Sequence, residues 1–147
     1  MHATLLMSVM KLTGCYNKPM KLPVLFQRIE GGALFVAVTY IYWLFGLDMG
    51  LFLLLFFSFD ISILGYLVNP RVGAISYNAV HSFVGPSALL AIGLYTSSIV
   101  ACAYALIWFA HLGFDRMIGF GLMHPDEFGN SHLDKKQLPK AIRRLLK

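Results

Sequence analysis

Apolar residues fill the middle of the chain in four long runs that short polar breaks separate. Between Gly31 and Phe114, a stretch of 84 residues contains only three charged side chains, Asp48, Asp60 and Arg71. A transmembrane helix needs roughly 20 mostly apolar residues, so this stretch is long enough for about four of them. The runs predict spans over residues 31–47, 50–68, 73–95 and 98–114.

The breaks between the predicted spans are short. The first lies around Asp48, the second is Asn69-Pro70-Arg71, and the third runs from Thr96 to Ser98. Short connections make successive helices antiparallel neighbours. The pattern therefore predicts an all-α fold, a four-span transmembrane helical bundle with up-and-down topology.

Lys and Arg residues flank alternate ends of these spans. Four precede the first span, none lies in the first break, Arg71 lies in the second, none lies in the third, and Arg116 begins the C-terminal flank. Because short cytoplasmic segments carry an excess of Lys and Arg, we expect both termini in the cytoplasm. The protein is then a multi-pass protein of the inner (plasma) membrane.

The two ends of the chain differ from its middle. We expect residues 1–28 to form a basic cytoplasmic leader, residues 29–123 the transmembrane domain, and residues 124–147 a cytoplasmic loop and basic tail. Over residues 138–147, apolar side chains recur at helical spacing and basic ones take the other face. This predicts a short amphipathic helix on anionic lipids at the membrane surface. A basic tail that acts only as a topology signal is the alternative.

Composition supports a membrane protein and excludes other classes. The chain is 58% hydrophobic and 13% charged, and its net charge of +5 equals that of residues 134–147 alone. A basic excess at one end of such a chain indicates topology and lipid contact, so we expect no nucleic acid as a partner. Cys15 and Cys102 lie in different kinds of segment, which argues against a disulfide scaffold.

Polar residues inside apolar spans are costly, and this makes them candidates for function. Asp60 lies ten residues after Gly50, and His81 lies ten residues after Arg71 on the antiparallel neighbour, so the two are expected at a similar depth. His111 and Asp115 are four residues apart and share a helix face. That spacing suits an imidazole oriented by a carboxylate, or two ligands of one metal.

These positions define the candidate site. The candidate catalytic residues are Asp60, His81, His111 and Asp115, and the candidate metal ligands are His81, His111, Asp115 and His132. The cofactor is unknown; imidazole with carboxylate suits a divalent metal such as zinc or iron.

Several motifs occur in order along the chain. They are Leu22-Pro23, Arg28-x-Glu30-Gly31, Asp60-x-Ser62-x-Leu64-Gly65-Tyr66, Pro70-Arg71-x-Gly73, Tyr77-Asn78-x-x-His81, His111-x-Gly113-Phe114-Asp115-Arg116-x-x-Gly119-Phe120-Gly121-Leu122, Phe128 and His132-Leu133. Together they resemble the bacterial integral membrane family known as domain of unknown function 4260.

The resemblance implies a compact four-span protein and no particular mechanism. Among the motif residues, Glu30, Asn78 and Arg116 are expected to support the site. The chain departs from the family pattern at four positions: Phe120 stands where Tyr is usual, Met123 for Lys, Ser131 for Thr and Asp134 for Gly. The first two departures remove a phenol and a cation from one turn.

Three functions fit this pattern. The first is an intramembrane enzyme or metal-binding protein, in which a bound metal activates water for hydrolysis. The second is a small proton-coupled transporter or channel, which would need a homo-oligomer because four short spans are few for alternating access. The third is a non-catalytic membrane assembly subunit, whose polar groups only hold helices together.

Overall fold

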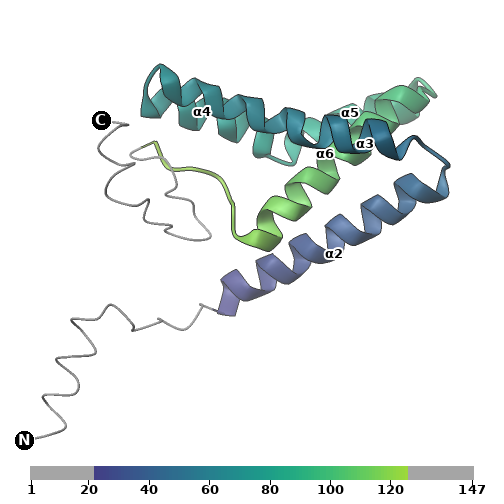
Figure 1. Ribbon diagram of the computed structural model, residues 1–147, viewed down its shortest axis with the longest axis horizontal. Helices are drawn as coiled ribbons and strands as arrows, with labels where there is room; N and C mark the ends of the chain where they lie inside the picture. The colour runs from purple at the N-terminus through teal and green to yellow at the C-terminus, as the bar shows by residue number, and fades with distance from the viewer. Residues whose placement is uncertain (1–21, 126–147) are drawn as a thin grey trace, which may run out of the picture.

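The computed structural model describes residues 22–125, and this part of the chain is all-helical, without strands (Figure 1). Three stretches are long and apolar enough to cross a membrane, namely Leu22–Leu44, Met49–Leu67 and Ile99–Ile118. The predicted helical fold class is therefore confirmed, together with three helices suited to a membrane. The elements are α2 (Leu22–Leu44), α3 (Met49–Phe56), the 3₁₀ helix η1 (Phe57–Leu67), α4 (Pro70–His81), α5 (Val84–Tyr95) and α6 (Ile99–Ile118).

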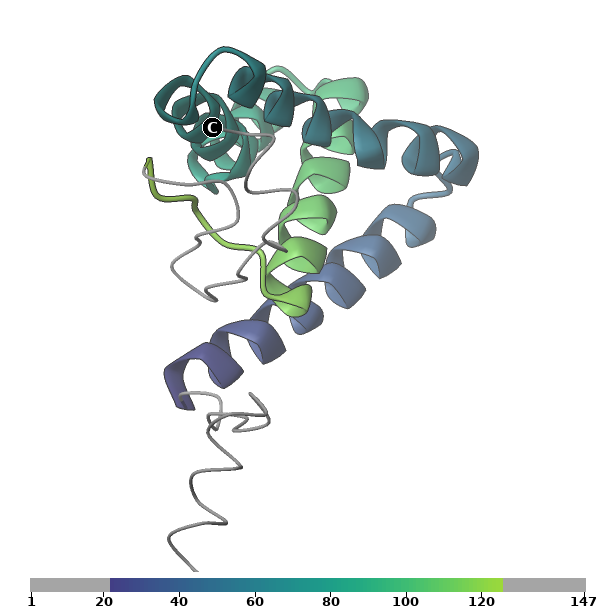
Figure 2. The ribbon, with the colours of Figure 1, turned by 60° about the vertical axis from the view of Figure 1, so that its left-hand side comes forward.

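Three pairings of helices organise the described part of the chain. Helix α2 lies along α6, η1 lies along α4, and α5 packs on the first part of α6 (Figure 1). Helix α2 and the α3–η1 stretch meet at the turn around Gly46 and diverge from there (Figure 2). Helix α6 lies between the two diverging stretches and contacts α2, α3 and η1 (Figure 2).

Helix α2 starts at Leu22, nine residues before the predicted span. Pro23 fits its first turn, because the first N–H groups of a helix have no partner within it. The predicted span starts at Gly31, directly after the charged residues Arg28 and Glu30, but charged residues do not interrupt a helix and α2 includes both. Residues 22–28 of the predicted leader are part of α2, and the Nε of Arg28 donates a hydrogen bond to the Met117 carbonyl at 2.9 Å.

The second predicted span is one continuous stretch with two kinds of helix. Asp48 caps α3, because its Oδ1 accepts hydrogen bonds from the N–H groups of Gly50 and Leu51 at 2.7 and 3.1 Å. After Phe56 the chain tightens into η1, an unusually long 3₁₀ helix. The charge of Asp48 therefore has a structural role.

The third predicted span is a broken helix. Helix α4 ends at His81, Ser82 is extended, and α5 starts at Val84. Pro86 explains the break, because its ring clashes with the carbonyl four residues earlier, that of Ser82, and offers no N–H. The break frees the Val80 carbonyl, which accepts a hydrogen bond from the Nε1 of Trp108 at 2.7 Å. The sequence predicted one span over residues 73–95 with a kink at Gly85-Pro86, whereas the structure has a full break at Ser82 and Phe83. Neither half is long enough to be a span alone.

Helix α6 carries more buried residues than any other helix of the structure, and it extends four residues past the predicted span. Ser98 caps its start, where the hydroxyl accepts from the N–H of Ala101 at 3.3 Å. Gly119 ends it in a left-handed conformation with φ of +94°. The chain then turns back, and residues 119–125 run toward α4 (Figure 1).

Two glycines bring α2 and α6 into backbone contact. A Cβ on Gly31 would lie 2.8 Å from the Gly113 carbonyl oxygen, and a Cβ on Gly113 would lie 2.8 Å from the Phe35 nitrogen. Side chains at these positions would push the helices apart. This crossing fixes where α6 sits on α2.

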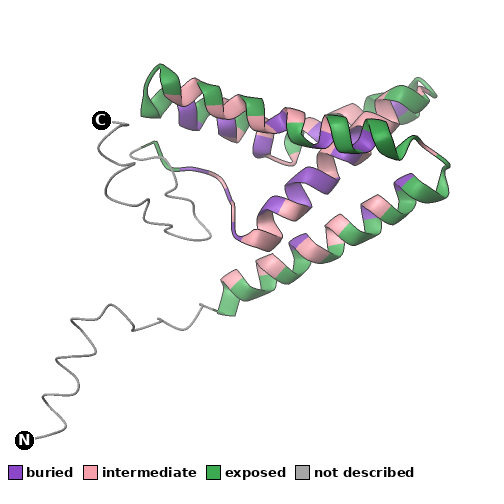
Figure 3. Cartoon of the chain, in the orientation of Figure 1, coloured by how far each residue is buried: buried purple, intermediate pink, exposed green. Residues whose placement is uncertain are grey.

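The outer surface of the described part is largely apolar, which is consistent with a membrane protein. Much of α2, α3 and η1 is exposed (Figure 3), including Leu54, Phe57 and Leu67. Exposed apolar surface on this scale marks contact with lipid or protein. The predicted amphipathic helix over residues 138–147 and the basic leader up to residue 21 lie outside the described residues.

Candidate functional site

Four of the predicted site residues lie together, and we call them the His/Asp cluster: Asp60, His81, His111 and Asp115. One ligand atom from each lies within 4.8 Å of all the others. Asp60 comes from η1, His81 from the last turn of α4, and the other two from adjacent turns of α6. Both imidazoles are buried, whereas the side chain of Asp60 is 44% exposed.

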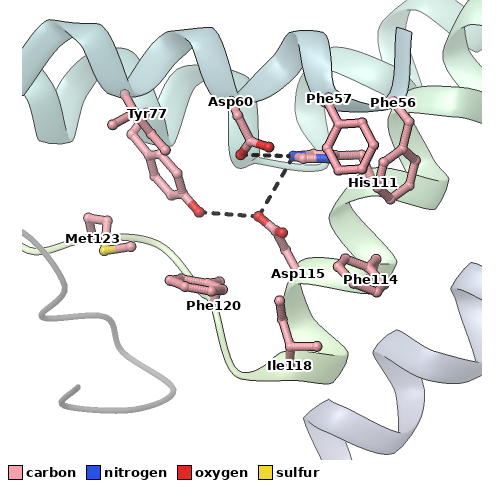
Figure 4. Close-up of a pocket in the computed structure, with 11 residues that line it drawn as sticks. Phe56, Phe57, Asp60, Tyr77, His111, Phe114, Asp115, Ile118, Phe120 and Met123 are labelled. Atoms are coloured by element: carbon pink, nitrogen blue, oxygen red, sulfur yellow. Dashed lines mark hydrogen bonds and ion pairs between the residues drawn. The ribbon is translucent and has the colours of Figure 1, made fainter. Parts of the chain in front are cut away.

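Four atoms, one from each residue, lie close together within the cluster. The two histidine Nε2 atoms are 3.1 Å apart. The Oδ2 of Asp115 lies 3.4 Å from the Nε2 of His81 and 3.7 Å from that of His111. The Oδ1 of Asp60 lies 4.0 and 3.8 Å from the same two nitrogens. Figure 4 shows Asp60, His111 and Asp115 converging from η1 and α6.

The backbone around the histidines controls which ring nitrogen carries a proton. The Nδ1 of His81 lies 3.0 Å from the Tyr77 carbonyl, and a carbonyl only accepts, so this Nδ1 donates. In the neutral ring the Nε2 lone pair then faces the cluster. The Nδ1 of His111 forms no hydrogen bond of good geometry within the described part of the chain, but the Phe56 carbonyl interacts with the ring.

Tyr77 supports the cluster in two ways. Its hydroxyl donates a hydrogen bond to the Oδ2 of Asp115 at 3.2 Å. Its ring stacks on His81, with centroids 3.7 Å apart and planes 8° from parallel. Partners of this kind orient ligands and fix their protonation. Tyr77 was not predicted as a site residue, although its position four residues before His81 puts both on one helix face.

A cavity of about 170 Å³ lies beside the cluster, and Asp60, Tyr77, His111 and Asp115 line one part of it (Figure 4). The rest of the wall is apolar. It consists of Phe56, Phe57, Ile63, Phe114, Ile118, Phe120 and Met123. Phe120 and Met123 stand where the resemblance of the motifs implies Tyr and Lys, and both make this part of the cavity wall apolar.

The 3₁₀ geometry of η1 builds one side of this cavity. In such a helix, side chains three residues apart lie above one another. Phe57, Asp60 and Ile63 have this spacing, and all three line the cavity. In an α-helix the same three positions would rotate progressively away from one line. The helix type therefore places Asp60 between two apolar neighbours.

Asn78 holds the segment after α6 in place. Its Nδ2 donates to the Met123 carbonyl at 2.8 Å, and its Oδ1 accepts from the Met123 N–H at 2.7 Å. The side-chain amide of Asn78 thus bonds both the N–H and the carbonyl group of Met123. Because Met123 and Phe120 line the cavity, Asn78 supports the site through this segment and not by joining the cluster.

Replacing Asn78 with alanine should release the segment after α6. Two hydrogen bonds to a buried backbone unit are lost, so the free energy of unfolding should fall by about 1–3 kcal/mol. Chymotrypsin cleavage after Phe120 should also become faster. Asn69→Ala is the matched control, since it removes a cap of α4 through the Val72 N–H and leaves the segment untouched. Equal cleavage rates in both variants would contradict this role.

The other predicted residues lie away from the cluster or outside the described part. Glu30 is exposed and attracts Arg116 electrostatically. The guanidinium of Arg116 lies 4.1 Å from the ring centroid of Phe83. The two residues thus link α2, α6 and α5 near the site. His132, a predicted metal ligand, lies outside the described residues.

The family described as Domain of unknown function (DUF4260) matches residues 24–135. The match covers most of the chain, including the whole His/Asp cluster, and it confirms the resemblance seen in the motifs. Comparison with the curated proteins and with the solved structures found no match.

Proposed function

The chain belongs to the DUF4260 family, and from this premise and the geometry of the cluster we propose that it is an integral membrane protein that binds one divalent metal ion. The His/Asp cluster supplies the ligands, and hydrolysis is the reaction that such a site supports best. The observation that carries the proposal is the arrangement of the four ligand atoms.

The spacing of these atoms fits a tetrahedral ion. With bonds of 2.0–2.1 Å, ligand atoms at the corners of a tetrahedron lie about 3.3–3.4 Å apart. Five of the six distances within the cluster are given above, and they run from 3.1 to 4.0 Å. A small inward movement of the carboxylates would complete the coordination. Zinc and iron are the metals that this ligand set favours.

Charge supports the same conclusion. Two ionised carboxylates beside two neutral imidazoles carry a charge of −2, which is costly in a low-dielectric interior. One divalent cation neutralises it. The two Nε2 atoms lie 3.1 Å apart, so either one of them carries a proton and donates it to the other or a cation lies between them.

The four residues would have different roles at the metal. His81, His111 and Asp115 are the most enclosed, and Tyr77 orients Asp115. Asp60 is the most exposed, lies farthest from the imidazoles, and lines the cavity. We therefore assign the first three as permanent ligands and Asp60 as an exchangeable ligand or general base. A divalent ion there would polarise a carbonyl group or lower the pKa of a water.

Metal analysis of the purified full-length protein tests the proposal. After treatment with chelator and return of Co²⁺, a four-coordinate His/Asp site should give visible absorption bands with one ion per chain. One tightly held ion supports the proposal. A protein that retains no metal and gives no cobalt spectrum contradicts it.

A proton relay is the second candidate, because each of these polar groups has another within 4.0 Å. The Tyr77 hydroxyl contacts Asp115, which contacts both histidines, and these approach Asp60. Such a chain suits a proton-coupled transporter, and four short spans would then require a homo-oligomer. Activity without metal, together with an oligomer in the membrane, would favour the relay. A cluster that neither binds metal nor titrates would indicate an assembly subunit.

For the membrane arrangement we propose four crossings in the inner (plasma) membrane, with α4 and α5 together as the third. Twelve residues in each helix give roughly 18 Å, and the two in sequence reach across a hydrocarbon core. Broken helices occur in membranes where they line a site. Both termini then face the cytoplasm, the cluster lies in the cytoplasmic half, and the basic tail contacts anionic lipids.

Reporter fusions test this topology. A fusion after Lys147 should be active on the cytoplasmic side, and one inserted at Asp48 should be active on the opposite side, because Lys and Arg flank only alternate ends of the helices. A fusion at Arg71 serves as an internal control and should match the C-terminal one. If α4 and α5 do not cross, the Arg71 and Lys147 fusions will report different sides.

A further inference from the structure

We propose that the cavity beside the His/Asp cluster takes the hydrocarbon chain of a lipid-like amphiphile, whose oxygen-bearing head group lies at Asp60, His111 and Asp115. This inference rests on the proposed metal site and names the class of substrate that it acts on. It is argued from the chemistry of the cavity wall, its size and its position on the molecule.

The wall of the cavity is divided into a polar and an apolar part. Cluster residues and the Tyr77 hydroxyl form one part, and seven aromatic or aliphatic side chains form the remainder. A ligand that satisfies both parts has one polar end and an apolar body. Outside the cluster and Tyr77, the described lining residues offer no polar side chain, so a sugar or a nucleotide would lose hydrogen bonds there.

The size of the cavity limits what enters it. Its volume of about 170 Å³ is close to that of an apolar cavity that binds benzene, roughly 150 Å³. Drug-sized ligands need pockets of about 300 Å³ or more. The cavity therefore holds the first few carbons next to the head group, and the rest of a longer chain must leave through the mouth.

The mouth opens on a face that is suited to lipid. Phe57 lines the cavity and is also 63% exposed, and the neighbouring side chain of Asp60 is 44% exposed. Both belong to the apolar stretch Met49–Leu67, which is long enough to cross a membrane. Ile61 and Leu64 continue the exposed apolar surface along η1. A chain dissolved in the bilayer thus reaches the cavity sideways, without passing through water.

Filling the cavity tests this inference, and η1 offers a matched control. Ile63 lines the cavity, whereas Ile61, two residues earlier, is 63% exposed and outside the lining. We would compare Ile63→Trp with Ile61→Trp in the full-length protein, loaded with Co²⁺ in phosphatidylcholine nanodiscs. Octanohydroxamate and acetohydroxamate are the probes, because both have the same oxygen head group and only the first has a long chain. The cobalt spectrum reports binding of the head group.

We expect Ile63→Trp to weaken binding of octanohydroxamate about tenfold or more, since overpacking of an apolar site is costly. Binding of acetohydroxamate should stay within about twofold, and Ile61→Trp should change neither probe by more than about twofold. The control also removes the effect of partition into the bilayer, which is the same for both variants. If Ile63→Trp does not fold, Ile118→Trp fills the same cavity from α6.

A second measurement does not depend on the metal. A fatty acid with a photoreactive diazirine near its carboxyl group should label the peptides that contain residues 56–63 and 114–123, and Ile63→Trp should reduce the labelling. Cobalt binding with no difference between the two tryptophan variants, and labelling elsewhere, would overturn the inference and leave the metal site standing. Cavity labelling without cobalt binding would overturn the metal site and retain the chain-binding cavity.

Discussion

Replacing both His81 and His111 with glutamine is expected to lower the affinity for zinc by about a hundredfold or more, because glutamine is a poor ligand for this metal. These two residues supply the nitrogen ligands of the cluster, and their Nε2 atoms are the closest pair in it at 3.1 Å. A bound ion also stabilises the folded state, by about 2.7 kcal/mol at a hundred times its dissociation constant. Zinc should therefore raise the melting temperature of the wild-type protein and not that of the double variant.

His124→Gln is the matched control for this experiment. His124 is exposed and does not belong to the His/Asp cluster, so its replacement should leave both zinc affinity and zinc-induced stabilisation unchanged. Retention of zinc by the double variant would contradict the assignment of the ligands. Equal melting temperatures with and without zinc in all three proteins would mean that the histidines act only as a strut between α4 and α6.

The cluster was predictable from the sequence because depth and helix face are simple functions of residue number. Asp60 lies ten residues after Gly50 and His81 ten residues after Arg71, so both are near the middle of antiparallel neighbouring spans. His111 and Asp115 are four residues apart, which places them on one helix face. Those two regularities hold even where the helices are imperfect. The roles assigned to these residues stay predictions until metal or activity is measured.

The form of the second and third spans was less predictable. The hydrophobic pattern over Met49–Leu67 has no period that distinguishes an α-helix from a 3₁₀ helix, so the alignment of Phe57, Asp60 and Ile63 gave no signal. Pro86 did give a signal for the break, but the carbonyl that it excludes lies four residues earlier, at Ser82. The kink was expected just above His81, and the structure has a full break directly after it.

Contacts between distant segments gave the weakest sequence signal. Asn78 forms hydrogen bonds with the backbone of Met123, 45 residues away. Every residue type except proline offers the same backbone N–H and carbonyl, so the sequence does not show which residue the partner is. Gly31 and Gly113 form the close crossing of α2 and α6, but as residues in an apolar sequence they do not differ from Gly65, Gly85 and Gly93. Those three also face close neighbours, Ser76, Trp108 and Cys102. Glycine content thus indicates close packing, but tertiary structure decides which helices meet.

The crossing of α2 and α6 predicts opposite outcomes for two adjacent substitutions. A Cβ on Gly31 would lie 2.7 Å from the Cβ of Arg116 and 2.8 Å from the Met117 nitrogen, and these atoms cannot move without moving α6. A Cβ on Gly32 would meet the sulfur of Met117 at 3.2 Å, which is the flexible end of a side chain. Both substitutions gain the same helix propensity, about 1 kcal/mol for alanine over glycine.

Gly31→Ala should therefore lower the free energy of unfolding by about 1–3 kcal/mol despite that gain, because overpacking forces the two backbones apart. Gly32→Ala should be neutral or stabilising. Since α6 carries His111 and Asp115, the shift at Gly31 should also weaken zinc binding, and the control should not. Thermal unfolding of both variants in the same detergent measures the first effect, and zinc titration the second. Equal stability of the two variants would show that α2 and α6 do not cross at Gly31 and Gly113.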